Sequence, residues 1–215
     1  MALNARHAPA TQRNREPILE VLERILPPTG TVLEVASGTG EHAVFFAPRL
    51  QPRQWLPSDV SLNALESIVA WGENSECSNL HPPVKLDASA SRWTIETKDA
   101  PQWVVALLKN EPLSAIASIN MIHISPWESC LGLMAGAGRL LPAGGKLYLY
   151  GPFRQGGKHT APSNEAFDES LRSQNPAWGV RNLEDVVAVA KQHHLTLQET
   201  VAMPANNLSV IFSHN

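Results

Sequence analysis

The chain has 215 residues, 43% of them hydrophobic, which is enough to bury a sizeable core in one domain. The formal net charge of −3 gives no global attraction to nucleic acid or to a membrane surface. Cys77 and Cys130 lie far apart without metal-ligand spacing, which argues against a disulfide framework and favours a reduced compartment.

The N-terminus lacks the apolar core of a signal peptide, and no apolar run reaches the length of a membrane span. We therefore expect a soluble, cytoplasmic protein without membrane or nucleic-acid partners. We expect a single domain over residues 1–215, with a loosely held segment at 1–12.

Helical and extended patterns alternate along the first half of the chain. Apolar residues at helical spacing predict a helix over 14–26, which Pro27 and Pro28 end. A short buried strand at 31–35 and a helix at 41–50 follow directly. The next expected elements are a strand at 54–58, a helix capped by Ser61, a strand at 84–86 and a small helix at 101–109.

The second half continues this alternation and ends in a strand pair. The expected elements are a strand at 115–119, a helix from 125 toward 141, a strand at 146–150, a helix capped by Asn182, and strands at 196–203 and 207–213. Alternation of this kind predicts an α/β fold with a mainly parallel sheet and helices on both faces. The short turn between the last two strands predicts an antiparallel pair.

A glycine-rich turn follows the first expected strand, at the sheet edge where ligands of open parallel sheets bind. Gly38 and Gly40 let the backbone approach a ligand, and the helix that follows favours an anionic group at its N-terminus. The turn also fits a dinucleotide-binding pattern through Ala43. A tight strand–helix turn without any ligand is the simpler interpretation of the glycines alone.

Acidic or amide residues end the next three expected strands. Asp59 lies 19 positions after Gly40, the spacing of an acid that binds ribose hydroxyls. Asp87 could accept a hydrogen bond from an adenine amine, with Ala88 supplying apolar surface, and Asn120 ends the fourth strand. Each could instead be a turn or capping residue, but together they favour an adenosine-containing ligand.

Glu34 stands inside an apolar strand, where an unpaired carboxylate is costly. A pyrophosphate beyond it would add repulsion, whereas a positively charged ligand would relieve it. S-adenosylmethionine combines an adenosine with an ammonium and a sulfonium. The alternatives for Glu34 are a salt bridge to a core arginine or lysine, or an outward turn at the strand end.

These stretches resemble the class I S-adenosylmethionine-dependent methyltransferases. The resemblance rests on LEVASGTGEHA, PSDV, KLDA, INMIHISP and LLPAGGKLYLYGPF, which follow one another in the order of the family's motifs from about residue 33 onward. It implies a Rossmann-like fold with a seven-stranded, mainly parallel sheet whose last strand is antiparallel. It also implies methyl transfer from S-adenosylmethionine, which would leave S-adenosylhomocysteine.

A closer resemblance covers nearly the whole chain. RNREPILEVLERILPP, SDVSLNALESIVAW, INMIHISPWE and GPFRQGGKHTAPSNEAFDESLRSQNPAWGVRN are similar to the methyltransferase-like 26 family, a group of uncharacterised methyltransferases. The resemblance to that family does not indicate a substrate, because none is assigned to the family. The chain lacks the Asn/Asp-Pro-Pro-aromatic motif of base-amine methyltransferases after the fourth strand, which removes the usual support for DNA adenine or protein glutamine methylation.

The resemblance implies a set of cofactor-binding residues. Glu34 would serve the ammonium, Asp59 the ribose hydroxyls and Asp87 the adenine amine. The full implied set is Arg13, Asn14, Glu34, Ser37, Gly38, Gly40, Asp59, Val60, Asp87, Ala88 and Asn120. Arg13 and Asn14 rest on the closer resemblance alone.

Candidates for chemistry on the acceptor lie near the last parallel strands. His123 is the candidate catalytic base by its position and chemistry, although it could equally be a packed or capping histidine. The segment at 151–167 reads as a long irregular loop, of the kind that often forms a lid. Within it, the candidate substrate-binding residues for a small acceptor that could be anionic are Phe153, Arg154, Lys158 and His159.

Three functions fit these features, of which methyl transfer to a small molecule is favoured. A binding module that holds S-adenosylmethionine without catalysis is the second, because methyltransferases need no obligatory catalytic residue. An NAD(P)-dependent oxidoreductase is the third, but it would usually need more chain beyond the nucleotide domain. The scattered histidines give no support for a metal site.

Overall fold

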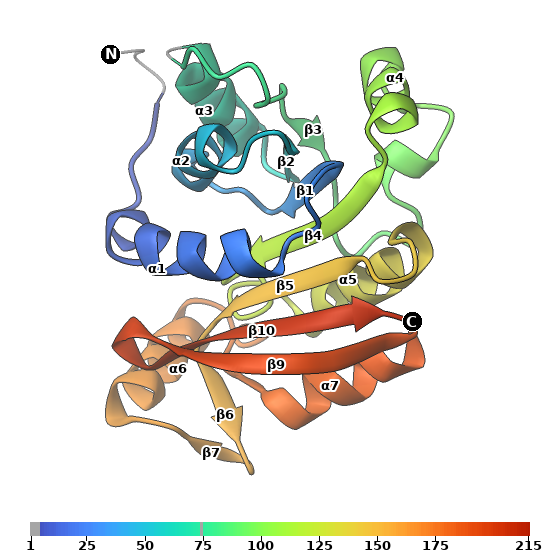
Figure 1. Ribbon diagram of the computed structural model, residues 1–215. Coiled ribbons are helices and arrows are strands. Elements are labelled where there is room, and N and C mark those ends of the chain that lie inside the picture. The colour runs from blue at the N-terminus through green and yellow to red at the C-terminus, as the bar shows by residue number, and fades with distance from the viewer. Residues whose placement is uncertain (1–4, 74) are drawn as a thin grey trace. The chain divides into compact units, whose positions relative to one another are not determined.

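Seven strands form one sheet in the order β3-β2-β1-β4-β5-β10-β9 (Figure 1). The computed structural model describes residues 5–73 and 75–215. β1 pairs in parallel with β2 and β4, and β2 pairs in parallel with β3, whereas β10 is antiparallel to both β5 and β9. These strands are β1 (Thr31–Val35), β2 (Gln54–Asp59), β3 (Val84–Lys85), β4 (Leu113–Ile119), β5 (Lys146–Gly151), β9 (Leu195–Met203) and β10 (Asn207–His214). The predicted mainly parallel sheet with an antiparallel last strand is confirmed.

The chain divides into two compact units. Unit 1 comprises Met1–Asp87 and Arg92–Ala117, and unit 2 comprises Ala88–Ser91 and Ser118–Asn215. Each unit is described by itself below. The expectation of a single domain stays a prediction.

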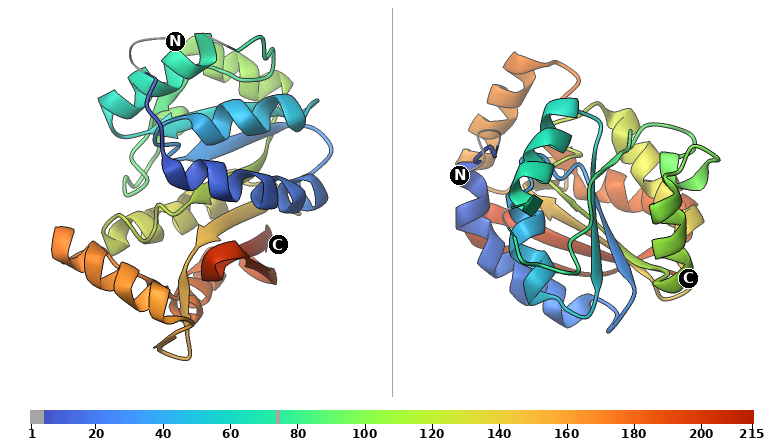
Figure 2. Two further views of the ribbon diagram at one scale, coloured as in Figure 1. Left: turned by 90° about the vertical axis from the view of Figure 1, so that its left-hand side faces the viewer. Right: turned by 90° about the horizontal axis from the view of Figure 1, so that it is seen from above.

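Unit 1 has helices on both faces of its strands. All five positions of β1 are buried, as expected for a strand that is covered on both sides. α1, α2 and α3 lie on one face and α4 on the other (Figure 2). Its helices are α1 (Pro9–Ile25), α2 (Glu41–Arg49), α3 (Leu62–Glu73), α4 (Gln102–Asn110) and the short 3-10 helix η1 (Thr94–Glu96).

The first helix begins earlier than the sequence pattern predicts. The expected helix covered 14–26, but α1 starts at Pro9, because proline fits the first turn of a helix, where its missing N–H has no partner to lose. Ile18 and Leu22 of this helix are fully buried. Part of the segment at 1–12 that was expected to be loosely held is therefore helical, while residues 1–4 lie outside the described residues.

Unit 2 contains a second, small sheet that the sequence did not predict. Its strand order is β7-β6-β8, with β6 (Phe153–Gln155), β7 (Lys158–His159) and β8 (Arg181–Asn182). The segment expected as an irregular loop forms the β6–β7 hairpin and the start of α6 (Pro162–Gln174). Gly156 and Gly157, both with positive φ, make the two-residue turn that a tight hairpin needs.

The other helices of unit 2 are α5 (Trp127–Leu140) and α7 (Leu183–Gln192). α5 and α7 pack against each other, and each of them also packs against β9. The 3-10 turn η2 (Pro204–Asn206) joins β9 to β10, which confirms the predicted antiparallel pair. Among the residues that the structure describes, no helix combines the length and the apolar character needed to cross a membrane.

Candidate functional site

The two glycines of the turn after β1 have different surroundings. Gly40 has a φ of +88°, and a Cβ placed there would lie 2.9 Å from the Cα of Ile68 on α3. Gly38 has a φ of +58°, but a Cβ placed there would meet nothing within 4 Å. The close approach of α3 therefore explains Gly40, whereas the space beside Gly38 is open to a ligand.

Asp59 fastens this turn to the end of β2. Its Oδ2 accepts a hydrogen bond from the backbone N–H of Gly38 at 2.9 Å, and its Oδ1 accepts one from the N–H of Ser61 at 2.9 Å. Ser37 adds a second link, because its N–H donates to the carbonyl of Ser58 at 2.8 Å and its hydroxyl accepts from the Ser58 N–H at 3.1 Å. Asp59 thus positions the glycine turn, a role that its spacing did not indicate.

Glu34 is buried beneath the same turn, with 1% of its surface exposed. Its Oε2 accepts a hydrogen bond from the indole Nε1 of Trp55 at 3.0 Å, instead of the core arginine or lysine considered from the sequence. Burial raises the pKa of Glu34 to about 7, with the charge of Asp59 adding to the effect, while hydrogen bonds from Trp55 and Ser37 oppose it. A nearby cation would restore the ionised form.

The start of α1 contacts α2 through Asn14. The Oδ1 of Asn14 lies 2.8 Å from Nε2 of His42. Burial lowers the pKa of His42 to about 4, and the charge of Arg15 adds to this, so the ring is neutral and donates its Nε2–H to Asn14. Arg13 is exposed, whereas Asn14 is 7% exposed, so only Arg13 keeps a solvent-facing side chain.

Residues 5–8 form a strap across α2 and α3, which we call the N-terminal strap. Glu41, in the first turn of α2, accepts hydrogen bonds from the backbone N–H of Ala8 and from Nδ1 of His7, the latter at 2.9 Å. The indole of Trp71 donates to the carbonyl of Arg6 at 3.0 Å, and its ring meets that of His7 edge-on. Sequence reasoning missed Glu41, although a first-turn acid is a common partner for N–H groups.

The predicted adenine end lies after β3 and β2. Asp87 and Val60 are exposed, and 55% of the Val60 surface faces solvent. Ala88 is buried, and a Cβ on Gly132 of α5 would lie 2.0 Å from its carbonyl oxygen, so α5 packs directly on this backbone.

In unit 2, Asn120 and His123 form a turn after β4. Asn120 has a φ of +62°; its N–H donates to the carbonyl of Tyr150 at 2.8 Å, and its own carbonyl accepts from the His123 N–H at 3.0 Å. A Cβ placed on Gly151 would lie 2.5 Å from Nε2 of His123 and 3.2 Å from Oδ1 of Asn120. Glycine at this position therefore lets the two side chains approach the end of β5.

His123 is fully buried, with its ring edge-on to Phe153 at 4.9 Å between ring centroids. The backbone N–H of Arg181 donates to its Nδ1 at 3.3 Å, which leaves the proton on Nε2. Burial lowers the pKa of His123 to about 3, and the charge of Arg181 adds to this. An imidazole this weakly basic is poorly suited to the general-base role predicted from its position.

The candidate substrate residues of the hairpin differ in exposure. Phe153 has no exposed surface, so its ring is part of the core and is not available to stack on a ligand in this conformation. Lys158 is exposed. Arg154 and His159 are half-buried cross-strand partners in the β6–β7 pair, and His159 Nε2 lies 3.6 Å from Oδ2 of Asp168 on α6.

The structure thus brings Glu34, Ser37, Gly38 and Asp59 together within unit 1. It brings Asn120 and His123 together within unit 2. Among the described parts of the chain, no group of three or more histidine, cysteine, aspartate or glutamate side chains has an arrangement that could hold a metal ion.

The sheet order and strand directions define a Rossmann-like α/β protein with the methyltransferase fold. Three solved structures share it. They are an O-methyltransferase family protein from Burkholderia thailandensis (TM-score 0.75, 12% identity, covering 96% of this chain and 57% of that chain), the S-adenosylmethionine-dependent methyltransferase SibL (0.71, 16%, 95% and 55%) and human N-acetylserotonin methyltransferase in complex with S-adenosylmethionine (0.70, 10%, 96% and 53%). The chain therefore spans a little over half the length of these proteins.

Residues 5–214 match the family described as a protein of unknown function, DUF938, so the chain belongs to that family.

Proposed function

We propose that the protein is an S-adenosylmethionine-dependent methyltransferase that acts on a small-molecule acceptor. The observation that carries this proposal is a buried carboxyl group, Glu34 on β1, together with an open space beside Gly38 in the turn that follows this strand. A buried carboxyl whose pKa is raised to about 7 gains most from a cationic ligand, which disfavours a pyrophosphate. The ammonium of the methionine part supplies such a charge.

The remaining cofactor contacts follow from the residues at the strand ends. Asp59 holds the glycine turn and would accept hydrogen bonds from ribose hydroxyls on its remaining lone pairs. Exposed Asp87 would bind the adenine amine, with Val60 and Ala88 as apolar neighbours. Ser37 and Gly40 shape the turn, Asn120 would serve the methionine end, and Arg13 and Asn14 would approach from α1.

S-adenosylmethionine supplies a sulfonium-bound methyl group that is open to in-line displacement. The task of the chain is then to orient the acceptor and exclude water. We assign His123 a positioning role and not that of a general base. Its buried Nε2–H is suited to donating a hydrogen bond, whereas its low pKa does not suit proton abstraction.

Support for a small acceptor comes from the structural neighbours, one of which is an N-acetylserotonin methyltransferase. The likeness of the sequence to the methyltransferase-like 26 family points to the same class of reaction. A cytoplasmic location and the absence of nucleic-acid partners are part of the proposal. A binding module without catalysis is the alternative, and an NAD(P)-dependent oxidoreductase is a more distant one.

Incubation with methyl-labelled S-adenosylmethionine and fractionated metabolite extracts tests catalysis. We expect label to pass to a low-molecular-weight product, with S-adenosylhomocysteine formed in equal amount, and Gly38→Ala to reduce both. Binding of S-adenosylhomocysteine without transfer to any fraction would favour the binding module.

A further inference from the structure

The small sheet of unit 2 places Arg154 at its centre. Arg154 is the register partner of His159 on β7 and of Asn182 on β8. Side chains of residues paired in this way lie on the same face of a sheet, with their Cβ atoms about 5 Å apart. The guanidinium of Arg154 and the ring of His159 are therefore neighbours on one face.

Both neighbours bury a polar atom without a partner. Nε of Arg154 and Nδ1 of His159 have no hydrogen-bond partner within the described residues. Such atoms are uncommon in folded proteins, because a buried donor or acceptor that is left unpaired costs about 1–3 kcal/mol. Two of them lie on directly paired residues, which leaves two polar atoms without a partner on one face of the small sheet.

The charged side chains around Arg154 and His159 include one carboxylate, that of Asp168, which already has hydrogen-bond donors. Arg172 donates to Oδ2 of Asp168 at 3.0 Å, and the N–H of Val180 donates to Oδ1 of the same carboxylate. Burial alone would raise the pKa of Asp168, but these hydrogen bonds and the nearby charges of Arg172 and His159 lower it. Asp168 is thus already an ionised and occupied acceptor.

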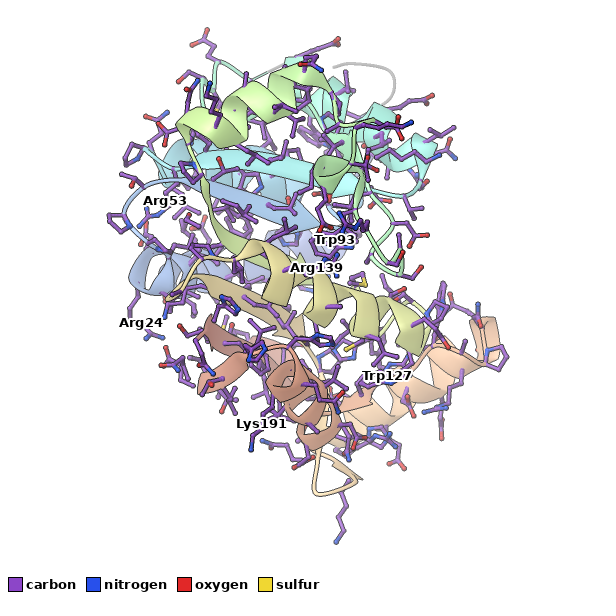
Figure 3. The ribbon with its side chains drawn as sticks, turned by 90° about the vertical axis from the view of Figure 1, so that its right-hand side faces the viewer. Arg24, Arg53, Trp93, Trp127, Arg139 and Lys191 are labelled. Atoms are coloured by element: carbon purple, nitrogen blue, oxygen red, sulfur yellow. The ribbon has the colours of Figure 1, made fainter. Side chains whose placement is uncertain are left out.

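Arg181 is also engaged, by backbone carbonyl groups. Its guanidinium donates to the carbonyls of Ile122 and Ser125 at 2.9 and 2.7 Å, and it lies 5.6 Å from the ring centroid of Trp127 on α5 (Figure 3 labels Trp127). Burial lowers the pKa of Arg181, and the charges of Arg172 and Arg154 are close enough to lower it further. Arg172 and Arg181 therefore both lie near the carboxylate of Asp168, and Arg154 lies near Arg181.

Arg154 is the member of this cluster whose charge is not balanced. In the portions of the chain that are described, its side chain makes no ion pair and no hydrogen bond. A planar guanidinium with an unpaired donor is the group that proteins use to bind carboxylates and phosphates in two-point contacts. An N–H at Nδ1 of His159 would add a second donor.

We propose that Arg154 and His159 form an oxyanion site that binds a carboxylate or phosphate group of the methyl acceptor. The assignment of the ligand as the acceptor rests on the proposed methyltransferase function, but the anion site itself does not. Exposed Lys158 lies next to His159 on the same strand and adds to the positive field. Buried Phe153 contributes to the core of the unit and is not a ligand contact.

The test is a titration of the full chain with inorganic phosphate and, separately, with acetate, followed by NMR at the His159 ring. We expect a saturable shift of the His159 signals in the wild type. Arg154→Gln should weaken this binding by about tenfold or more, because a charge-assisted hydrogen bond is lost. Arg154→Lys keeps the charge and should show an intermediate affinity. The tighter of the two probes identifies the acceptor group as a phosphate or a carboxylate.

Lys191→Gln is the matched control, because it removes one positive charge from α7 of the same unit (Figure 3 labels Lys191) without touching the cluster. Equal anion affinities for Arg154→Gln and Lys191→Gln, or the absence of a saturable His159 shift in the wild type, would overturn the site. S-adenosylhomocysteine affinity, measured on the same samples, should be unchanged in both variants. If the wild type does not bind S-adenosylhomocysteine, the methyltransferase proposal is refuted, but the anion site is not.

Discussion

Trp55 donates a hydrogen bond from its indole nitrogen to Oε2 of Glu34 across 3.0 Å. The two residues lie on adjacent parallel strands, where Trp55 is paired with Val32, two positions before Glu34. A diagonal contact of this kind holds the carboxyl group in one orientation beneath the glycine turn. It satisfies only part of the hydrogen-bonding capacity of the group, and burial keeps its pKa raised to about 7.

The raised pKa of Glu34 predicts a pH-dependent stability. Between the ordinary pKa of 4.5 and about 7, the folded chain holds a proton that the unfolded chain has released. The stabilising contribution of Glu34 to the free energy of unfolding is therefore fully present below pH 4.5 and is lost as the pH rises through about 7. The loss amounts to about 3 kcal/mol. Glu34→Gln keeps an acceptor for Trp55 and does not titrate, so it should gain stability relative to the wild type as the pH rises.

Denaturant unfolding across this pH range checks the prediction. Three histidines oppose Glu34, because burial lowers the pKa of His42, His81 and His123 in the folded chain, and their rings take up protons on unfolding below the ordinary pKa of 6.5. Their contribution is lost as the pH falls. In Glu34→Gln no titration of residue 34 offsets this loss, so the free energy of unfolding should decline more steeply on acidification than in the wild type. Parallel curves for the two proteins would contradict the raised pKa.

Binding of a cationic ligand should release the proton of Glu34. An ammonium beside the carboxyl favours its ionised form, so S-adenosylhomocysteine should bind more tightly as the pH rises through about 7. We expect Glu34→Gln to bind more weakly and with little pH dependence in this range. Calorimetry in buffers of different ionisation enthalpy measures the released proton, and an unchanged affinity in Glu34→Gln would refute the proposed contact.

The two glycines of the turn offer a matched pair of substitutions. Gly38→Ala places its Cβ in open space and costs about 1–2 kcal/mol for the left-handed backbone. Gly40→Ala pays the same backbone cost and also meets the backbone of Ile68, which adds about 1–3 kcal/mol. Thermal melting should thus show Gly40→Ala as the less stable variant. Titration should show Gly38→Ala as folded but impaired in cofactor binding, and normal binding by Gly38→Ala would mean that the open space is not the ligand's.

Removing the charge of Glu41 should loosen the N-terminal strap. The carboxylate accepts hydrogen bonds from both His7 and Ala8, and a glutamine accepts through only one oxygen. We expect Glu41→Gln to speed proteolysis within residues 5–8 and to alter the fluorescence of Trp71, whose indole binds the carbonyl of Arg6. Lys109→Gln on α4, at a helix end away from the strap, is the control. Identical proteolysis of the two variants would show that Glu41 does not hold the strap.

The succession of strands and helices along the chain and the glycine turn could be predicted because they depend on local patterns. Buried runs such as 31–35 and the residues that end them are visible in the sequence, and the chain folds them into the expected parallel sheet. The β6–β7 hairpin was missed because its strands have only three and two residues, too few to show alternation. Its double-glycine turn was the one signal that could have indicated it.

The individual roles in the site depended on contacts that no spacing reveals. The indole partner of Glu34 comes from the neighbouring strand, and the packing reason for Gly40 comes from α3. His123 had the right residue type and position for a base, yet complete burial gives its ring a low pKa. Burial is a property of the assembled fold. The sequence could therefore indicate these residues as candidates for the site, but it could not predict their roles.

Calorimetric titration of the protein with S-adenosylhomocysteine, S-adenosylmethionine and NAD tests the central claim most directly. The proposal predicts saturable one-to-one binding of the first two ligands and no binding of NAD, since a buried carboxyl under the turn disfavours a pyrophosphate. Tight binding of NAD, with no response to either S-adenosyl compound, would contradict it.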